Sequence, residues 1–323
     1  MRLFALNASR PFGERVAAQI GVALDAHEER SFEDGEHKAR PLVSVRGADA
    51  YVIQSLHGGP DESPNDKLVR LLFFLATLRE NGAARVTAVV PYLCYARKDR
   101  QTKPRDPVTT RYVAELFEAA GADRVATLEV HNLAAFQNAF RCETVHLDLR
   151  SVFLDYAAAL AKGDIVVASP DPGGVKRAQL FREALEARIG RPVGQAFMEK
   201  RRSGGVVSGD LLVGEVKGAR VLVVDDIIAS GGTMARAARA CREHGAAEVH
   251  ALAAHGLFTG DAADTLADPA LSGVIVSDTV PPFRLSAAAR DRVEIVSAAP
   301  AFAEAISRLA GGGPISGLAG PME

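Results

Sequence analysis

The sequence predicts an α/β protein made of two similar domains with largely parallel sheets, related by internal duplication. Apolar runs rich in β-branched residues alternate with helical segments, which is typical of βα units whose strands pair in parallel. These runs cover residues 51–53, 86–90, 125–128, 165–168, 221–224, 249–253 and 274–276. The second observation behind this prediction is a short pattern that occurs in each half of the chain.

In this pattern a Gly-Ala pair precedes an apolar run, a histidine follows the run, and a threonine stands upstream at the same separation in both halves. The matched pairs are Thr109 and Thr233, Gly121 and Gly245, Val125 and Val249, and His131 and His255. This recurrence predicts that the halves are copies of one βαβ-based domain. Two similar helix-turn-strand units could also produce so short a match without duplication.

The chain is long enough for two domains, each with its own core. It has 323 residues, 48% of them hydrophobic. We expect an N-terminal domain at 1–147, a C-terminal domain at 148–310 and a flexible glycine-rich tail at 311–323.

Charge and cysteine content exclude several classes of function. The formal net charge of -2 gives no support to nucleic-acid binding. The 3 cysteines are odd in number and far apart, which argues against a disulfide framework or a zinc site and favours a reducing cytoplasm. The longest apolar stretch near the N-terminal half, at residues 71–78, is too short to span a bilayer, so we expect neither secretion nor membrane insertion.

The segment after the run at 221–224 indicates a pocket for a phosphorylated sugar. It contains, in order, Asp225, Asp226, Ala229, Ser230, Gly231, Gly232 and Thr233. The two glycines can adopt backbone angles that turn successive N–H groups toward a phosphate at the start of the next helix, and the two hydroxyl groups can add donors. The paired acids suit ribose hydroxyls or water around a magnesium ion. Neither the P-loop nor the dinucleotide spacing occurs here.

The first half of the chain differs at the place that the short pattern matches to this phosphate cradle (residues 230–233). Pro107 and Val108 precede Thr109, and proline has no N–H to offer an anion. The interval before Thr109 is also longer and rich in cations, namely Arg97, Lys98, Arg100, Lys103 and Arg105. We therefore expect the second half to bind the sugar phosphate and the longer basic loop of the first half to bind a polyanion.

With these features in place, the chain resembles the ribose-phosphate pyrophosphokinase family over nearly its whole length. Besides the cradle, the motifs that carry the resemblance are FEDGE at 32–36, YARKDR at 95–100, LEVH at 128–131, SPDPGG at 169–174 and KRR at 200–202. The resemblance implies two phosphoribosyltransferase-type domains. It also implies transfer of the β,γ-diphosphoryl group of ATP to the C1 hydroxyl of ribose 5-phosphate, with Mg²⁺ required, in a homo-oligomer that is often a hexamer.

The resemblance implies a role for each motif. The ATP-binding residues would be Asp34, Gly35, Glu36, Arg97, Lys98 and Arg100. Those of the ribose 5-phosphate site would be Arg202, Asp225, Asp226, Ala229, Ser230, Gly231, Gly232 and Thr233. Lys200 and Arg202 would stabilise the transition state, beside a glycine-rich lid at 203–209, and His131 and Asp171 would be associated with the metal.

Three positions depart from the usual family pattern: Lys98 replaces a glutamine, Pro172 a histidine and Ala229 an acid. The loss of a carboxylate at Ala229 removes an acceptor for sugar hydroxyls or metal-bound water, and Lys98 leaves the choice of nucleotide donor open. Two other functions fit parts of the sequence, namely a phosphoribosyltransferase and a noncatalytic regulatory relative. The ATP-side motifs count against the former, and the retained Lys200, Arg202 and Asp171 count against the latter.

Overall fold

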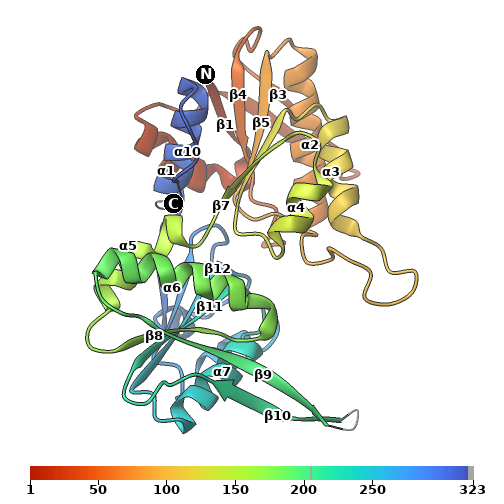
Figure 1. Cartoon of the computed structure of the whole chain (residues 1–323). Helices are drawn as coiled ribbons and strands as arrows, with labels where there is room; N and C mark the ends of the chain where they lie inside the picture. Colours follow the sequence, from red (N-terminus) through yellow and green to blue (C-terminus); the bar gives the residue numbers. More distant parts are fainter. Residues whose placement is uncertain (204–205, 319–323) are drawn as a thin grey trace. The chain divides into compact units, whose positions relative to one another are not determined.

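The chain forms two compact units in the computed structural model (Figure 1). The first comprises Met1–Asp148 and Ala298–Glu323, and the second comprises Leu149–Ser297. Residues 1–203 and 206–318 are described, and for residues 200–210 the description is limited to the backbone. Across these described parts, none of the helices is long and apolar enough to cross a membrane.

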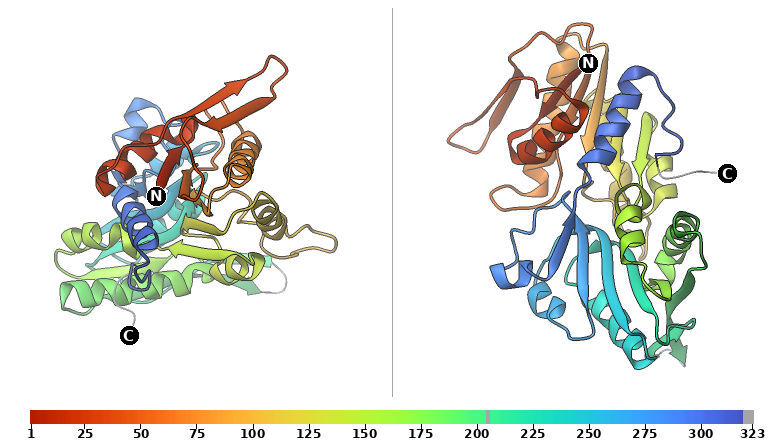
Figure 2. Two further views of the ribbon diagram at one scale, coloured as in Figure 1. Left: turned by 90° about the horizontal axis from the view of Figure 1, so that it is seen from above. Right: turned by 90° about the vertical axis from the view of Figure 1, so that its left-hand side faces the viewer.

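The first unit is built on a parallel five-stranded sheet in the order β1-β4-β5-β6-β7. The strands are β1 (Arg2–Ala5), β4 (Asp49–Ile53), β5 (Arg85–Val90), β6 (Arg124–Leu128) and β7 (Glu143–Leu147). The helices of this part of the chain are α1 (Arg10–Ile20), α2 (Pro64–Glu80), α3 (Thr109–Ala119) and α4 (Leu133–Ala139). A separate antiparallel hairpin, β2 (His27–Ser31) with β3 (His37–Pro41), projects from this unit (Figure 2).

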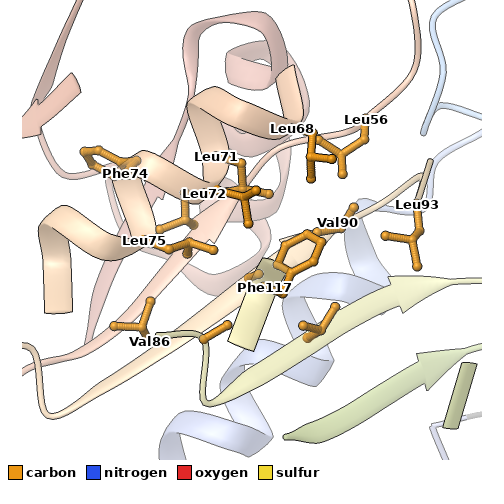
Figure 3. Close-up of a cluster of buried hydrophobic side chains, with 14 of the residues drawn as sticks. Leu56, Leu68, Leu71, Leu72, Phe74, Leu75, Val86, Val90, Leu93 and Phe117 are labelled. Carbon is orange, nitrogen blue, oxygen red and sulfur yellow. The ribbon is translucent and has the colours of Figure 1, made fainter. Parts of the chain in front are cut away.

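The core of the first unit lies where α2 and α3 cover one face of this sheet. Leu71 and Leu75 of α2 and Phe117 of α3 are fully buried, and they belong to the same cluster as Val86 and Val90 of β5 (Figure 3). Full burial of each such side chain contributes about 1.5–3 kcal/mol. This packing holds the carboxyl ends of the strands, and the loops that follow them, in fixed positions.

The C-terminal helix α10 (Ala299–Gly311) belongs to the first unit rather than to the second. It lies beside α1 (Figure 2), where the rings of Phe12 and Phe302 meet edge to face with centroids 5.7 Å apart. Phe302 and Ile306 are buried, so the helix covers apolar surface of the unit that begins the chain. The sequence-based domain of 148–310 therefore differs from the observed unit by this helix. Residues 319–323 of the expected tail lie outside the described residues.

The second unit contains a seven-stranded sheet in the order β10-β9-β8-β11-β12-β13-β14, antiparallel only between β9 and β10. Its strands are β8 (Ile165–Ser169), β9 (Gly194–Ser203), β10 (Val206–Val213), β11 (Arg220–Ile228), β12 (Glu248–Gly256), β13 (Gly273–Ser277) and β14 (Val293–Val296). The helices are α5 (Arg150–Leu160), α6 (Val175–Ile189), α7 (Gly232–Glu243), α8 (Ala262–Leu266) and α9 (Ala287–Arg290). Short 3₁₀ turns follow β1 and β8, η1 (Asn7–Ser9) and η2 (Pro172–Gly174).

The five-stranded sheet has the same strand order as the β8-β11-β12-β13-β14 part of the seven-stranded sheet, so the predicted α/β fold with duplicated halves is confirmed. In both units the chain forms a strand, a 3₁₀ turn, a helix and a hairpin, and then returns in a strand that pairs with the first one. β1 therefore corresponds to β8, and β4 corresponds to β11. The pairing registers agree as well. The first residues of β4 and β5, Asp49 and Arg85, pair with each other, and so do the first residues of β11 and β12, Arg220 and Glu248. β4, β5 and β6 therefore correspond to β11, β12 and β13.

This correspondence corrects the register of the repeat that the sequence pattern suggested. The counterpart of Gly245, which precedes β12, is Gly82 before β5, and not Gly121 before β6. The local geometry agrees, because Ala84 N–H donates to Ala48 O as Ala247 N–H donates to Ala219 O. Gly82, Gly121 and Gly245 all have left-handed φ values, of 85°, 83° and 86°. The similarity of Gly121 thus reflects a helix-to-strand junction that the fold uses repeatedly.

Candidate functional site

The carboxyl ends of β8 and β11 bring together an arginine and two aspartates. Arg177 of α6 lies 3.1 Å from Asp225 Oδ1 through Nη1 and 3.4 Å from Asp226 Oδ1 through Nη2. The three side chains are only 14%, 16% and 6% exposed. We call them the Arg177 cluster. A single guanidinium group thus bridges two adjacent carboxyl groups, which satisfies charge that would otherwise be costly to bury.

The position of Asp225 raises its pKa well above the ordinary value for a carboxyl group. Burial is the main cause, and the neighbouring Asp226 carboxyl acts in the same direction, whereas Arg177 opposes both. The backbone N–H of Asp226 also donates to Asp225 Oδ1 at 2.9 Å. Because Arg177 supplies a countercharge, it favours the charged form of Asp225 against these two larger effects.

Asp171 lies in the turn after β8, and β8 is the strand that pairs with β11. Its Oδ1 accepts the backbone N–H of Gly174 at 3.1 Å, which caps the 3₁₀ turn, and Ser169 Oγ donates to its carbonyl oxygen at 2.6 Å. A Cβ at position 174 would approach Ser169 Oγ to 2.7 Å, so only glycine fits this turn without displacement. The SPDPGG segment therefore holds Asp171 at the same edge of the sheet as the Arg177 cluster.

The predicted phosphate cradle forms the start of α7, directly after β11. Gly231 has a φ of 78°, and a Cβ there would also lie 3.2 Å from Thr265 Cγ2. The residue at the cap position, Gly231, has no side chain that could cap the helix, and Ala235 N–H donates to Gly231 O. The N–H groups between them point out of the helix start, where the helix dipole favours an anion. Ser230 is exposed and Thr233 is half-buried at this end.

Ala229, the departure next to the cradle, is half-buried, and its carbonyl oxygen accepts the backbone N–H of Thr259 at 2.9 Å. The backbone here is therefore fixed by the segment after β12. The missing carboxylate does not disturb the turn that forms the cradle.

The corresponding helix of the first unit, α2, begins in a different way. Ser63 Oγ accepts the Asp66 N–H at 3.2 Å, and Asp66 Oδ2 accepts the Ser63 N–H at 2.8 Å. This capping box places a carboxylate where α7 leaves room for a phosphate. The predicted cradle therefore has no equivalent at α2, for a reason that the sequence comparison with Pro107 did not identify.

The acids of the Arg177 cluster are also replaced in the first unit. When β4 is aligned with β11 through the pairing of each with its neighbour, β5 or β12, Gln54 and Ser55 take the positions of Asp225 and Asp226. The pairing of β1 with β4 likewise puts Asn7 at the position of Asp171. The first unit therefore carries neutral side chains where the second carries carboxylates.

The predicted transition-state residues lie on the β9–β10 hairpin. The backbone of Lys200 pairs with Asp210 and that of Arg202 with Val207. β9 runs beside β8, with Ser169 opposite Phe197, so both residues lie further along β9 than the end of β8. Their side chains, and residues 204–205 of the expected lid, lie outside the described residues.

The basic loop (residues 91–108) follows β5 in the first unit. Its stem is fixed to α3, because buried Thr110 donates from Oγ1 to the carbonyl oxygens of Tyr95 and Lys98 at 3.1 and 3.2 Å. Arg97 and Arg100 are exposed, as a role in binding a polyanion requires. By topology the loop corresponds to the segment after β12, so it is an insertion and not a modified cradle.

Lys98 differs from its two basic neighbours. Its Nζ lies 2.5 Å from Asp106 Oδ2 and 3.0 Å from Thr102 Oγ1, so the charge is paired within the loop. This hydrogen bond is the largest cause that holds the pKa of Asp106 well below its ordinary value. The extra cation expected from the sequence is therefore compensated.

His131 follows β6 and is exposed, next to Asn132, which caps α4. Asn132 Nδ2 donates to Asp99 Oδ2 at 2.6 Å, which ties the His131 turn to the basic loop. His131 lies in the first unit and Asp171 in the second, so each is described within its own unit. Topology matches His131 to Val280 after β13, and not to His255, which is buried and bonded to Thr279 through Nδ1 at 2.8 Å.

Asp34, Gly35 and Glu36 form the exposed tip of the β2–β3 hairpin. Asp34 Oδ1 accepts the N–H of Glu36 at 3.1 Å. Gly35 has a φ of 93°, and no heavy atom lies within 4 Å of the position of a Cβ there. Glycine is therefore required by the backbone conformation of the turn.

The carboxylate of Asp171 is an oxygen ligand of the kind that Mg²⁺ prefers. Within the described residues, no three His, Cys, Asp or Glu side chains converge as a complete metal site. Mg²⁺ commonly keeps several waters and uses one or two carboxylates together with substrate phosphates, so a complete cage is not required. Asp171 offers such a carboxylate at the edge of the sheet that carries the cradle.

The structure also identifies residues that the sequence analysis missed. Arg177 is separated from Asp225 by 48 residues, and its partners become visible only when β8 and β11 pair. Its place in the first turn of α6, directly after the SPDPGG segment, is a local signal that sequence reasoning can use. Asp106 carries no such signal, since a single acid in a basic loop is usually a solvated residue.

Comparisons with known proteins agree with this geometry. The model of the N-terminal domain of ribose phosphate pyrophosphokinase matches residues 1–121, and that of the phosphoribosyl synthetase-associated domain matches residues 209–319. Ribose-phosphate pyrophosphokinase of Caldanaerobacter subterraneus is 37% identical, over 98% of this chain and 97% of that protein. The corresponding enzyme of Hyphomonas neptunium is 36% identical, over 98% and 99%.

A solved structure is similar over the same extent. The phosphoribosylpyrophosphate synthetase of Mycobacterium smegmatis has a TM-score of 0.85 and 34% identity, covering 97% of this chain and 99% of that one. Sequence similarity over nearly the full length, the matches to both domain models and the shared fold show that the chain belongs to the ribose-phosphate pyrophosphokinase family.

Proposed function

We propose that the protein transfers the β,γ-diphosphoryl group of ATP to the C1 hydroxyl of ribose 5-phosphate, releasing phosphoribosyl pyrophosphate and AMP. The observation that carries this proposal is the start of α7 beside the Arg177 cluster. It combines an uncapped helix start for a phosphate with carboxylates for sugar hydroxyls. The family relationship over the full chain supplies the reaction class.

In this proposal the second unit binds the acceptor. Gly231, Gly232 and the hydroxyls of Ser230 and Thr233 bind the sugar 5-phosphate, beside Ala229. The carboxylates of Asp225 and Asp226 accept hydrogen bonds from ribose hydroxyls, with Arg177 holding them in place. This arrangement would orient C1 and reduce the entropic cost of the transfer.

ATP binds to the first unit in this proposal. The exposed guanidinium groups of Arg97 and Arg100, on the loop that also carries Lys98, meet phosphates or the adenine face. The turn of Asp34, Gly35 and Glu36 supplies acceptors for donors on the nucleoside. These assignments follow the family motifs and agree with the exposure of both segments.

Lys200 and Arg202 are proposed to stabilise negative charge on the transferred group. Positioned cations of this kind contribute roughly 10³–10⁵ to the rate in phosphoryl transfer. Asp171 would be a ligand of Mg²⁺, which would neutralise phosphate charge, and His131 would act through water or contact a phosphate. The proposal also includes homo-oligomeric assembly, with a hexamer as the expected form, and a cytoplasmic location.

The test is AMP release from ATP and Mg²⁺ with and without ribose 5-phosphate. We expect AMP only when the sugar is present, and none after chelation of the metal. A Lys200→Ala variant should lose turnover far more than it loses affinity for the sugar phosphate. Absence of sugar-dependent AMP at high enzyme concentration would contradict the proposal. Release of pyrophosphate that depends on a nucleobase would instead indicate a phosphoribosyltransferase.

A further inference from the structure

The contacts of Asp106 single out this residue within the basic loop. Its Oδ2 accepts the Lys98 ammonium group at 2.5 Å and the Thr102 hydroxyl at 2.7 Å. The same oxygen accepts the backbone N–H groups of Thr102 at 3.2 Å and Lys103 at 3.0 Å. One carboxylate oxygen therefore gathers two side chains and two backbone groups from the segment before it.

The main chain at Asp106 reinforces this closure. Its N–H donates to Lys103 O at 3.1 Å, and its carbonyl oxygen accepts Gln101 Nε2 at 2.9 Å. The preceding residue, Arg105, has a φ of 69°, which is uncommon for a residue other than glycine. The chain thus turns sharply at Arg105 and returns Asp106 toward Lys98.

The remainder of the loop is held at its base by other groups. Thr110 binds the carbonyl oxygens of Tyr95 and Lys98, and Asn132 binds Asp99. These contacts fix the stem, where Arg97 lies, but they do not reach the tip. Closure of the tip, which follows Arg100, depends on Asp106.

We propose that Asp106 and Lys98 form a latch that closes the basic loop on itself, and that Asp106 is a positioning residue for ATP binding. The latch sets the tip of the loop, which directly follows Arg100, and so limits the positions that Arg100 can take. The Lys98 ammonium group is paired with Asp106 within the loop, so Lys98 acts through Asp106 and does not contact the nucleotide. This inference rests on the proposed role of the loop in binding ATP.

The latch and a direct contact of Lys98 with ATP predict opposite results. If Lys98 contacted a phosphate, Asp106→Asn would free its charge and lower the KM for ATP, while Lys98→Gln would raise it. A latch predicts that either substitution raises the KM for ATP. It also predicts that the double variant is no worse than the worse single variant, because both remove one interaction.

The experiment measures sugar-dependent AMP release by wild type, Asp106→Asn, Lys98→Gln and the double variant, with ATP and ribose 5-phosphate varied in turn. We expect the KM for ATP to rise about tenfold in each, which corresponds to 1.4 kcal/mol. The KM for ribose 5-phosphate and kcat should stay within about twofold of wild type, a split that general destabilisation would not produce. Glu115→Gln is the matched control, because Glu115 lies on α3 in an exposed pair with Arg111 and should change neither constant.

Trypsin cleavage after Arg100 provides a second readout that does not require activity. Opening of the latch should increase the cleavage rate in all three variants and not in Glu115→Gln. An unchanged or lower KM for ATP in Asp106→Asn, or additive losses in the double variant, would overturn the latch. If wild type releases no sugar-dependent AMP, the proposed function fails, while the cleavage rates still decide whether the latch exists.

Discussion

Replacement of Arg177 by alanine tests the physical basis of the sugar site. The change leaves Asp225 and Asp226 next to each other, 16% and 6% exposed, without the guanidinium group that bridges them at 3.1 and 3.4 Å. Removal of one partner from a buried ion pair costs about 3–5 kcal/mol. For a unit of about 150 residues this corresponds to a loss of roughly 6–20 °C in Tm, at 2–4 °C per kcal/mol.

The loss should depend on pH, with a sign that the structure determines. The pKa of Asp225 is raised in the folded state, so between its unfolded and folded values the folded protein binds more protons and stability falls as pH rises. Arg177 lowers this pKa, and its removal raises the pKa further. Arg177→Ala should therefore cost more stability at about pH 8 than at about pH 5, where Asp225 is protonated with or without the arginine.

Differential scanning calorimetry at the two pH values measures both effects. The matched control is Arg188→Ala on the same helix, because Arg188 forms an exposed pair with Asp155, 55% and 82% exposed, of the kind that contributes about 0–1 kcal/mol. A second variant, Arg177→Ala with Asp225→Asn, should recover much of the stability at about pH 8, where it removes one of the two adjacent charges. Equal losses for Arg177→Ala and Arg188→Ala, or a loss independent of pH, would refute this reasoning.

Two further predictions concern the starts of α7 and α2. Gly231→Ala should destabilise the second unit by about 1–2 kcal/mol, because a residue with a left-handed backbone acquires a Cβ, and it should raise the KM for ribose 5-phosphate. Gly232→Ala is the control for stability, because Gly232 does not have a left-handed backbone. Equal Tm values for the two variants would contradict the argument. Ser63→Ala should lower the free energy of unfolding, measured by thermal denaturation, by about 1 kcal/mol, because it removes the capping box with Asp66. The KM values for both substrates should stay unchanged. A raised KM for ribose 5-phosphate would instead indicate that the substrate binds at α2.

Much of the fold was predictable because apolar runs identify buried parallel strands without knowledge of their partners. The seven predicted runs lie in β4, β5, β6, β8, β11, β12 and β13. Among the strands that escaped prediction, β1 (Arg2–Ala5) is short, and β2 (His27–Ser31) and β3 (His37–Pro41) are polar. A polar hairpin with little buried surface has no hydrophobic pattern to reveal it.

The sequence by itself determined the α/β class, and it predicted the duplication and a phosphate cradle at Gly231, because each of these depends on residues that are neighbours in the chain. Only the tertiary structure decided the register of the repeat, since left-handed glycines recur at several helix-to-strand junctions and strand order distinguishes them. It also decided that α10 returns to the first unit. The Arg177 cluster, finally, joins residues from α6 and β11, and a contact between distant segments exists only after the parallel strands have paired.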